Sequence, residues 1–215
     1  MPVAELQSRL ESCYEINLPY RVEDFTTTDV NLARLLDGDH PHQPHERLLL
    51  QQTGDDLSMS LYLDADLMAR LATIEELYTA ADEHLADLSL ALEGVSHFVY
   101  MAWNASYERP VSLLELELQA EVDRFVMLLL LQQEQGVAAF GKLHQWLFED
   151  VSFAATLDEE QLARYRTANR FAARYCWSLG RQYQQLKGGA DWYNELRRFY
   201  RLQHDAKLRY IHSLH

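Results

Sequence analysis

Residues 112–136, SLLELELQAEVDRFVMLLLLQQEQG, decide the fold. Ser112 and Glu115 form a capping box, in which each side chain satisfies a free backbone N–H of the first helical turn. From Phe125 to Leu131 the helix is apolar all round, which requires neighbours on every side. Gly136 is a typical helix stop. The stretch therefore predicts a central helix with at least two other helices packed on it.

The residues before this stretch predict a partner helix, so that 73–135 forms a helical hairpin with its turn near Pro110. Thr73 and Glu76 form another capping box, and Pro110 cannot continue a helix. Apolar or small side chains recur between them with a helical period: Leu77, Ala81, Leu85, Leu88, Leu92, Val95, Val99 and Ala102. The apolar run of the second arm is shorter than the roughly 20 residues that span a bilayer.

The remaining segments complete an α+β, predominantly α fold, with a four-helix-bundle-like core and a small N-terminal β-hairpin. Short helices are expected at 3–13, 29–36 (capped by Thr28) and 142–149, a short strand at 20–25, and strands at 47–52 and 57–63. Two further long helices are expected, 156–186 with a Thr156–Glu159 capping box and 191–210 with Ala206 and Tyr210 inward. We expect an N-terminal α/β element, 1–66, packed on a helical bundle, 67–215, as one integrated domain.

Composition limits the partners and the compartment. The 215 residues carry a formal net charge of −14, which argues against nucleic acid and anionic membranes as partners. Cys13 and Cys176 are too few for a disulfide framework or a cysteine-ligated metal. The N-terminus has no secretory signal pattern, so we expect a soluble, cytoplasmic protein.

The first candidate site combines Glu93 and His97 of the first arm with Glu117 and Glu121 of the second. Position 97 and position 121 each lie about nine residues from the turn, so they are level with one another. Two carboxylates and an imidazole at one level suit a divalent metal or a general acid/base pair. Tyr100 lies beside them on the first arm.

The helical angles favour a simpler interpretation. These polar side chains point away from the leucine and valine seams of the two arms, so they can meet only if a third element covers both outer faces. We therefore favour a solvated polar stripe with a Glu121–Arg124 ion pair. No resident cofactor is predicted, and a divalent metal is the alternative.

A row of cations on the helix at 156–186 is the second candidate site, suited to an anion or a partner. Guanidinium groups bind phosphate and carboxylate groups well. The row can also dock the acidic back of the hairpin, in the same or a second subunit. Its members are Arg166, Arg170, Arg174 and Arg181, and Trp177 lies among them.

Three weaker sets complete the candidates. The first comprises polar residues on inward faces, each expected in a hydrogen-bonded core position: His84, Glu115, Asn169 and Gln203. The second comprises the histidines of the 40–45 loop, a weak zinc or nickel site: His40, His42 and His45. The third is an aromatic small-ligand pocket between bundle and hairpin: Tyr62, Trp103 and Tyr165.

Two functional hypotheses follow. We favour a binding or scaffolding protein, a homodimer or a partner of another protein, because aromatic and arginine side chains are enriched in interfaces. Its surface would hold Trp177, Arg170, Arg174, Arg198 and Arg201. The alternative is a metal-dependent or acid/base enzyme that uses His97 and the glutamates around it.

Overall fold

The computed structural model describes residues 2–37, 45–54, 56–74, 77, 84–136, 139–153, 155, 157–186 and 189–214. These residues form nine α-helices, one short 3-10 helix and a three-stranded sheet. The fold is therefore α+β and predominantly α, as the sequence predicts. None of the described helices is both long and apolar enough to cross a membrane.

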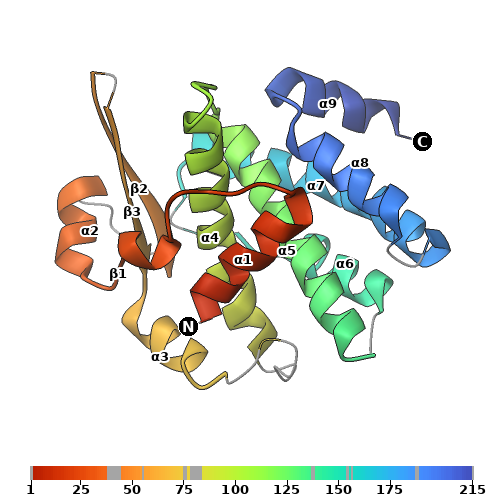
Figure 1. The fold of residues 1–215 in the computed structure, drawn as a ribbon, viewed down its shortest axis with the longest axis horizontal. Helices are drawn as coiled ribbons and strands as arrows, with labels where there is room; N and C mark the ends of the chain where they lie inside the picture. Colours follow the sequence, from red (N-terminus) through yellow and green to blue (C-terminus); the bar gives the residue numbers. More distant parts are fainter. Residues whose placement is uncertain are drawn as a thin grey trace.

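The predicted hairpin lies at the centre, formed by α4 (Leu85–Ala105) and α5 (Leu113–Glu134). α5 also packs against α7 (Glu159–Leu186), and α4 packs against α1 (Pro2–Tyr14). Figure 1 shows α1 crossing in front of the hairpin and α7 behind it. The prediction that α5 is a central helix covered by several neighbours is confirmed.

The two capping boxes of the hairpin differ from expectation. Thr73 lies in a turn after α3 (Ala65–Leu71), where its hydroxyl donates to the Arg70 carbonyl at 2.6 Å; Glu76 lies outside the described residues. Ser112 Oγ accepts from the Glu115 N–H at 3.2 Å, as predicted. The Glu115 carboxylate, however, accepts from the Tyr100 hydroxyl at 2.6 Å.

The small sheet has the order β1-β3-β2. β2 (Glu46–Thr53) and β3 (Asp56–Leu63) form the predicted antiparallel hairpin, and β1 (Thr26–Thr27) pairs parallel with β3. The strand predicted at 20–25 is wrong, because Val22–Phe25 forms the 3-10 helix η1. The side chain of Gln7 accepts from the Val22 N–H and donates to the Tyr20 carbonyl, at 2.7 Å each. These two backbone groups are therefore not available for hydrogen bonds with a neighbouring strand.

The β2–β3 hairpin is buried at one end only. Leu61 and Leu63 are fully buried, and Tyr62 is buried on the opposite face of the same strand. Leu57, near the turn, is exposed. In Figure 1 the turn of this hairpin extends beyond the helices, with α2 (Val30–Asp37) on its outer side. Asp29, not Thr28, caps α2 by accepting from the Asn31 N–H at 2.8 Å.

The second half of the chain contains α6 (Phe140–Phe148), α7, α8 (Ala190–Tyr200) and α9 (His204–Ser213). α7 begins with a reciprocal capping box between Asp158 and Gln161, with bonds of 2.7 and 3.1 Å. The predicted partner Thr156 lies outside the described residues.

The single helix predicted at 191–210 is wrong, because the chain leaves the helix between Tyr200 and His204. The break changes which residues of α9 face the core. Lys207 and Ile211 are fully buried, whereas the predicted inward positions Ala206 and Tyr210 are only partly buried. The face of α9 that points inward is therefore the one that buries Lys207 with its hydrogen bonds, not the one that the apolar spacing predicts.

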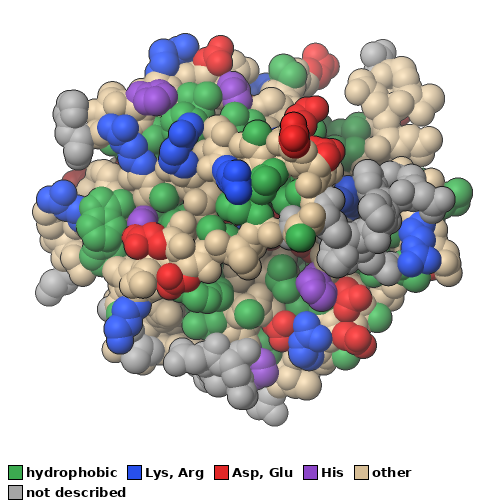
Figure 2. Space-filling model, turned by 180° about the vertical axis from the view of Figure 1, so that it is seen from behind, with side chains coloured by type: hydrophobic (Ala, Val, Ile, Leu, Met, Phe, Trp, Pro, Cys, Tyr) green, Lys and Arg blue, Asp and Glu red, His purple; other side chains and the backbone are tan. Residues whose placement is uncertain are grey.

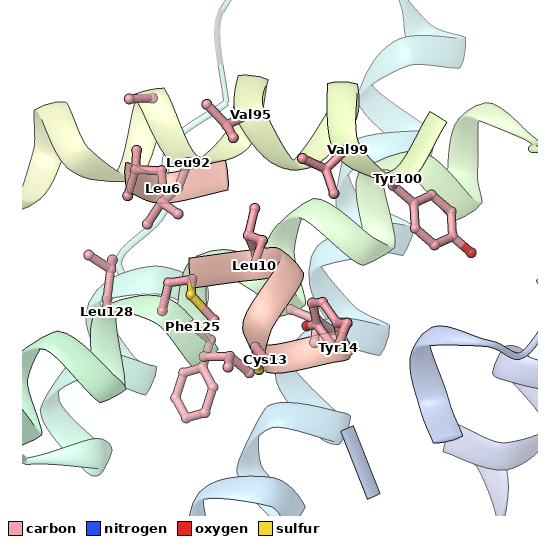
Figure 3. Packing of buried hydrophobic residues seen from close by; sticks show 14 of the residues in the cluster. Leu6, Leu10, Cys13, Tyr14, Leu92, Val95, Val99, Tyr100, Phe125 and Leu128 are labelled. Atoms are coloured by element: carbon pink, nitrogen blue, oxygen red, sulfur yellow. The ribbon is translucent and has the colours of Figure 1, made fainter. Parts of the chain in front are cut away.

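Apolar side chains from α1, α4 and α5 form one continuous core. Figure 3 shows Leu6 and Leu10 of α1 facing Leu92 and Val95 of α4, with Phe125 of α5 close by. All five side chains are fully buried. This apolar packing holds the hairpin rigidly, and the polar groups considered next lie on either side of it.

Candidate functional site

The central polar cluster, which we call the Glu–His cluster, comes from three elements. α4 contributes a glutamate and a histidine one turn apart, α5 contributes two glutamates one turn apart, and β2 contributes its first residue. An arginine of α5 completes it. Its members are Glu46, Glu93, His97, Glu117, Glu121 and Arg124.

His97 lies between two carboxylates. Its Nδ1 is 3.7 Å from Glu46 Oε2, and its Nε2 is 3.4 Å from Glu117 Oε2. The imidazole is 5% exposed and Glu117 is 8% exposed. His97 and Glu121 were predicted to lie at the same level along the hairpin. This prediction is correct to within one helical turn, because His97 contacts Glu117, which is one turn from Glu121.

Arg124 holds the other two glutamates. Its Nη1 lies 3.3 Å from Glu93 Oε2 and 3.2 Å from Glu121 Oε1, so the predicted Glu121–Arg124 ion pair is confirmed. The Arg124 Nε donates to Ser89 Oγ at 2.8 Å. The cluster therefore has two halves: His97 lies between Glu46 and Glu117, and Arg124 lies between Glu93 and Glu121.

Burial changes the proton affinities of the cluster. Burial raises the pKa of Glu93 to about 8, although Arg124 opposes this shift. Burial also raises the pKa of Glu121. For His97, burial alone would lower the pKa, but the carboxylates of Glu117 and Glu46 next to its ring nitrogens raise it well above its usual value. With a pKa of about 8, Glu93 is mostly protonated at neutral pH.

Three atoms of the cluster are buried without a hydrogen bond: Glu46 Oε2, His97 Nε2 and Glu121 Oε2. The His97–Glu117 contact is an ion pair whose geometry does not align a hydrogen bond. Buried polar atoms normally find partners, and an orphaned one costs about 1–3 kcal/mol. These three atoms of the cluster therefore remain available to a further partner.

The interpretation of these residues as a solvated stripe is wrong. The side chains do point away from the apolar seams, as the angles predict, but β2 and α7 pack over the outer faces of α4 and α5. Burial raises the pKa of Tyr165 on α7, with Glu117, Glu93 and Glu46 as the next causes, which places this tyrosine in the field of the cluster. The third element that the sequence alone does not reveal is thus present.

A glycine allows β2 to reach the cluster. A Cβ at Gly94 of α4 would lie 2.9 Å from Leu61 Cδ1 and 3.0 Å from Glu46 Oε2. The sheet can approach α4 this closely only because position 94 lacks a side chain. Sequence analysis did not identify Glu46; an isolated glycine within a helix is the signal that a backbone approaches closely there.

A second polar cluster, which we call the Asp123 network, lies on the α1 and α9 side of the hairpin. Asp123 accepts from Ser96 Oγ at 2.5 Å, from Gln119 Nε2 at 2.7 Å, and from the Tyr14 hydroxyl. Lys207 of α9 donates to Gln119 Oε1 at 2.6 Å and to the Tyr100 hydroxyl at 2.8 Å.

The Asp123 network is fully enclosed, with Lys207 at 0% exposure. Burial lowers the pKa of Lys207 to about 7 and raises the pKa of Asp123 to about 6. The sequence signal for this network is the spacing of Glu115, Gln119 and Asp123, which are polar at every fourth position of an apolar helix. Only Glu115 was predicted there.

The weaker candidates do not assemble as sites. Asn169 is buried as predicted, with its Nδ2 unbonded, whereas Gln203 is exposed and His84 is partly buried. Trp103 packs among Tyr100, Tyr107 and Tyr200, away from the predicted aromatic pocket. His40 and His42 lie outside the described residues, and the carbonyl of His45 accepts from the Asp64 N–H at 2.8 Å.

The arginine row does not cover the Glu–His cluster of its own chain. Arg166, Arg170, Arg174, Arg181 and Trp177 are all exposed on α7. On the same helix Ala172 and Leu179 are fully buried, so the row occupies the face directed away from the core. Docking of the row onto the hairpin within one subunit is therefore wrong, and Arg124 provides the neutralising charge instead.

Within the described ranges, no three His, Cys, Asp or Glu side chains converge closely enough to hold a metal ion as they stand. Comparison of the chain with protein-family models, with curated proteins and with solved structures finds no match. No similar protein therefore suggests a function for the two clusters, and their geometry is what bears on it.

Proposed function

We propose that this protein is a metal-dependent enzyme that binds one divalent transition-metal ion in the Glu–His cluster. The observation that carries the proposal is the group of three buried atoms without hydrogen bonds in that cluster, on Glu46, His97 and Glu121. His97 and Glu117 would be the first two ligands, through Nε2 and Oε2.

The separation of these two atoms suits a shared ion. Metal–ligand distances of about 2.0–2.1 Å place two ligands of a tetrahedral ion about 3.3 Å apart. His97 Nε2 and Glu117 Oε2 are 3.4 Å apart. A third ligand is Glu121, one turn along α5, after its side chain rotates away from Arg124. Glu46, on the Nδ1 side of the ring, would orient the imidazole, as carboxylates commonly do for metal-bound histidines.

The charge of the cluster also supports a dication. A histidine that binds a metal ion is neutral. With His97 neutral, four ionised carboxylates face the single guanidinium of Arg124, which leaves a formal charge of −3. Without a further cation, Glu93 holds a proton up to a pKa of about 8. A bound dication would offset most of this charge and favour release of that proton.

The donor set favours zinc, iron(II) or manganese(II), because imidazole and carboxylate together suit these ions. Such an ion acts as a Lewis acid and lowers the pKa of bound water. Glu93, ionised beside the bound dication, would then be the base that accepts a proton from that water.

The proposal is tested by adding Zn²⁺ or Mn²⁺ to metal-free protein and following thermal unfolding. Saturation at about 100 times the dissociation constant should stabilise the fold by about 2.7 kcal/mol, or roughly 5–10 °C in Tm for a chain of this size. His97→Ala and Glu117→Gln should lose this gain.

His212→Ala is the matched control, because His212 is exposed on α9 and its ring lies against Phe171, with ring centroids 5.2 Å apart. This variant should keep the full shift. Equal shifts in His97→Ala, Glu117→Gln and the control would contradict the proposal. A shift lost only when His40, His42 and His45 are replaced would assign the metal to the loop instead.

A protein-binding function is the second candidate, and the state of the arginine row favours it. Arg166 and Arg170 are exposed, and neither pairs with a carboxylate in the described part of the chain. Arg198 and Arg201 are used internally, by Glu195 and by the carbonyls of Tyr14 and Glu15. A second copy of this acidic chain is the partner we propose for the row.

Light scattering over a concentration series tests the homodimer. Arg170→Glu should shift the chain toward the monomer, whereas Lys142→Glu, a charge change on α6, should not. A monomer at every concentration for the unchanged chain would remove this second function.

A further inference from the structure

A groove of about 500 Å³ lies between α6, α7 and the C-terminal end of α9. Its lining includes His144 of α6 and Arg174, Trp177, Ser178, Arg181 and Gln182 of α7. α7 lies behind α5 in Figure 1, and Figure 2 shows that the face seen from behind carries basic, acidic and hydrophobic side chains. The groove has the size of pockets that hold small molecules.

The groove contains two arginines, of which Arg174 is hydrogen-bonded to the backbone of the described chain and Arg181 is not. Arg174 donates to the carbonyl of His212 at 3.2 Å and to the carbonyl of Leu214, so it fastens the C-terminal end of the described chain. Arg181 is exposed, and no ion pair or hydrogen bond joins it to any described residue. None of the described residues that line the groove is a carboxylate.

An aromatic surface lies beside this cation. Trp177 is 46% exposed, and its ring packs against Phe140 at 5.4 Å and against His144 at 5.1 Å. His144 is buried, with Nε2 bonded to the Ala173 carbonyl at 2.8 Å. Its Nδ1 makes no hydrogen bond and lies 3.6 Å from Glu149 Oε1, a largely exposed carboxylate.

We propose that the α6–α7 groove binds a small anion that carries a planar ring, with Arg181 on the anionic group and Trp177 against the ring. A guanidinium binds phosphate or carboxylate through paired N–H groups, and the exposed indole offers a flat surface for stacking. Ser178 and Gln182 supply hydrogen bonds for the polar edge of the ring. A nucleoside monophosphate has this chemistry, and so does an aromatic carboxylate.

The proposal rests on charge as well as shape. The chain as a whole carries a net charge of −14, so a basic groove without a carboxylate is a local exception. The site is separate from the Glu–His cluster and does not depend on a metal there. Each of the two proposals can therefore fail without the other.

Calorimetric titration with AMP, adenosine, inorganic phosphate and 4-hydroxybenzoate tests the groove. AMP should bind with a dissociation constant below about 1 mM, and adenosine and phosphate should each bind about tenfold more weakly. Binding of 4-hydroxybenzoate in place of AMP would support the carboxylate form of the same proposal.

Variants locate the binding. Arg181→Gln and Trp177→Leu should each weaken AMP about tenfold, the size expected for a lost charge-assisted contact. Arg166→Gln removes a guanidinium from the same helix outside the groove and should leave the affinity unchanged. Circular dichroism checks that each variant is folded. The proposal is overturned if no probe binds, if adenosine binds as well as AMP, or if Arg181→Gln and Arg166→Gln have the same effect.

Discussion

At the scale of single residues, Glu93 is the most sensitive reporter of the Glu–His cluster. Its carboxylate is buried beside Arg124, yet burial outweighs the ion pair and raises its pKa to about 8. The unfolded chain loses this proton near the usual pKa of 4.5. Between these values the folded state binds more protons, so its stability falls as the pH rises.

Glu93→Gln should therefore stabilise the metal-free protein at alkaline pH. The amide has the shape of the protonated acid and no charge, so the variant should lose the fall in stability between about pH 4.5 and 8. We expect a gain on the order of 5 kcal/mol at pH 9, since the shift from 4.5 to about 8 spans about 3.5 pKa units and each unit corresponds to about 1.4 kcal/mol, and little change at pH 4.5. Chemical unfolding at both pH values in EDTA gives the comparison. A variant less stable than the wild type at pH 9 would show that the Arg124 ion pair dominates.

Lys207 gives the opposite dependence on pH. Burial lowers its pKa from 10.5 to about 7, so between these values the unfolded chain binds more protons and the stability of the fold rises with pH. Lys207→Met should remove this rise and leave Gln119 Oε1 without its donor, which costs about 1–3 kcal/mol at high pH. Urea unfolding at pH 7 and pH 10 measures both effects. An unchanged slope in the variant would mean that Lys207 stays charged in the fold.

The sequence allowed Glu93, His97, Glu117 and Glu121 to be selected as a set, because helical spacing and distance from the turn are fixed by geometry. It could not show their burial. Burial depends on which distant segments cover a face, and neither Glu46 nor Tyr165 is near these residues in the chain. The Asp123 network was missed for the same reason, since Lys207 comes from the far end of the chain.

At the scale of elements, the close approach of the sheet to α4 controls the site. Gly94 brings Leu61 and Glu46 against the helix backbone, and Glu46 then reaches His97 Nδ1. A glycine in a helix interior costs up to about 1 kcal/mol relative to alanine. Its presence here is explained by packing that no other residue permits.

Gly94→Ala should destabilise the protein despite the better helix propensity of alanine. The new Cβ would meet Leu61 Cδ1 at 2.9 Å, and overpacking of this kind costs about 1–3 kcal/mol. Because Glu46 is displaced as well, metal binding should weaken more than it does in Gly141→Ala, a change on α6 where a Cβ would meet nothing within 4 Å. Urea unfolding and metal titration give the two readouts. A Gly94→Ala protein that is more stable than the wild type would show that the sheet does not pack as described.

Element boundaries were predictable where local chemistry sets them. Ser112 begins α5 as its hydroxyl predicts, and the β2–β3 hairpin follows its alternating pattern. The helix predicted at 191–210 was wrong because neither proline nor glycine marks the break. Tertiary contacts cause it: Arg201 donates to the carbonyls of Tyr14 and Glu15, and Lys207 enters the Asp123 network.

At the scale of the whole molecule, the hairpin separates two buried polar clusters by one apolar seam. The Glu–His cluster lies under β2 and α7, and the Asp123 network lies under α1 and α9. The Asp123 network satisfies its hydrogen bonds internally, whereas the Glu–His cluster leaves three buried atoms unbonded. This difference is the reason why we propose a further partner for the Glu–His cluster and none for the Asp123 network.

The class of the fold followed from the sequence because leucine spacing, capping residues and alternation act locally. The four-helix-bundle-like core remains an interpretation: α4, α5 and α7 are helices of 21, 22 and 28 residues, but α1, which also packs against both α4 and α5, has only 13. The expected homodimer and cytoplasmic location also remain predictions.

Elemental analysis tests the central claim most directly. Protein produced without a histidine tag and purified without chelators should carry about one equivalent of zinc, iron or manganese per chain, and His97→Ala should carry less than about a tenth of that amount. The surface variant His212→Ala should match the wild type. Less than about a tenth of an equivalent of any transition metal in the wild type, unchanged in His97→Ala, would contradict the metal site and make the Glu–His cluster a buried ion network.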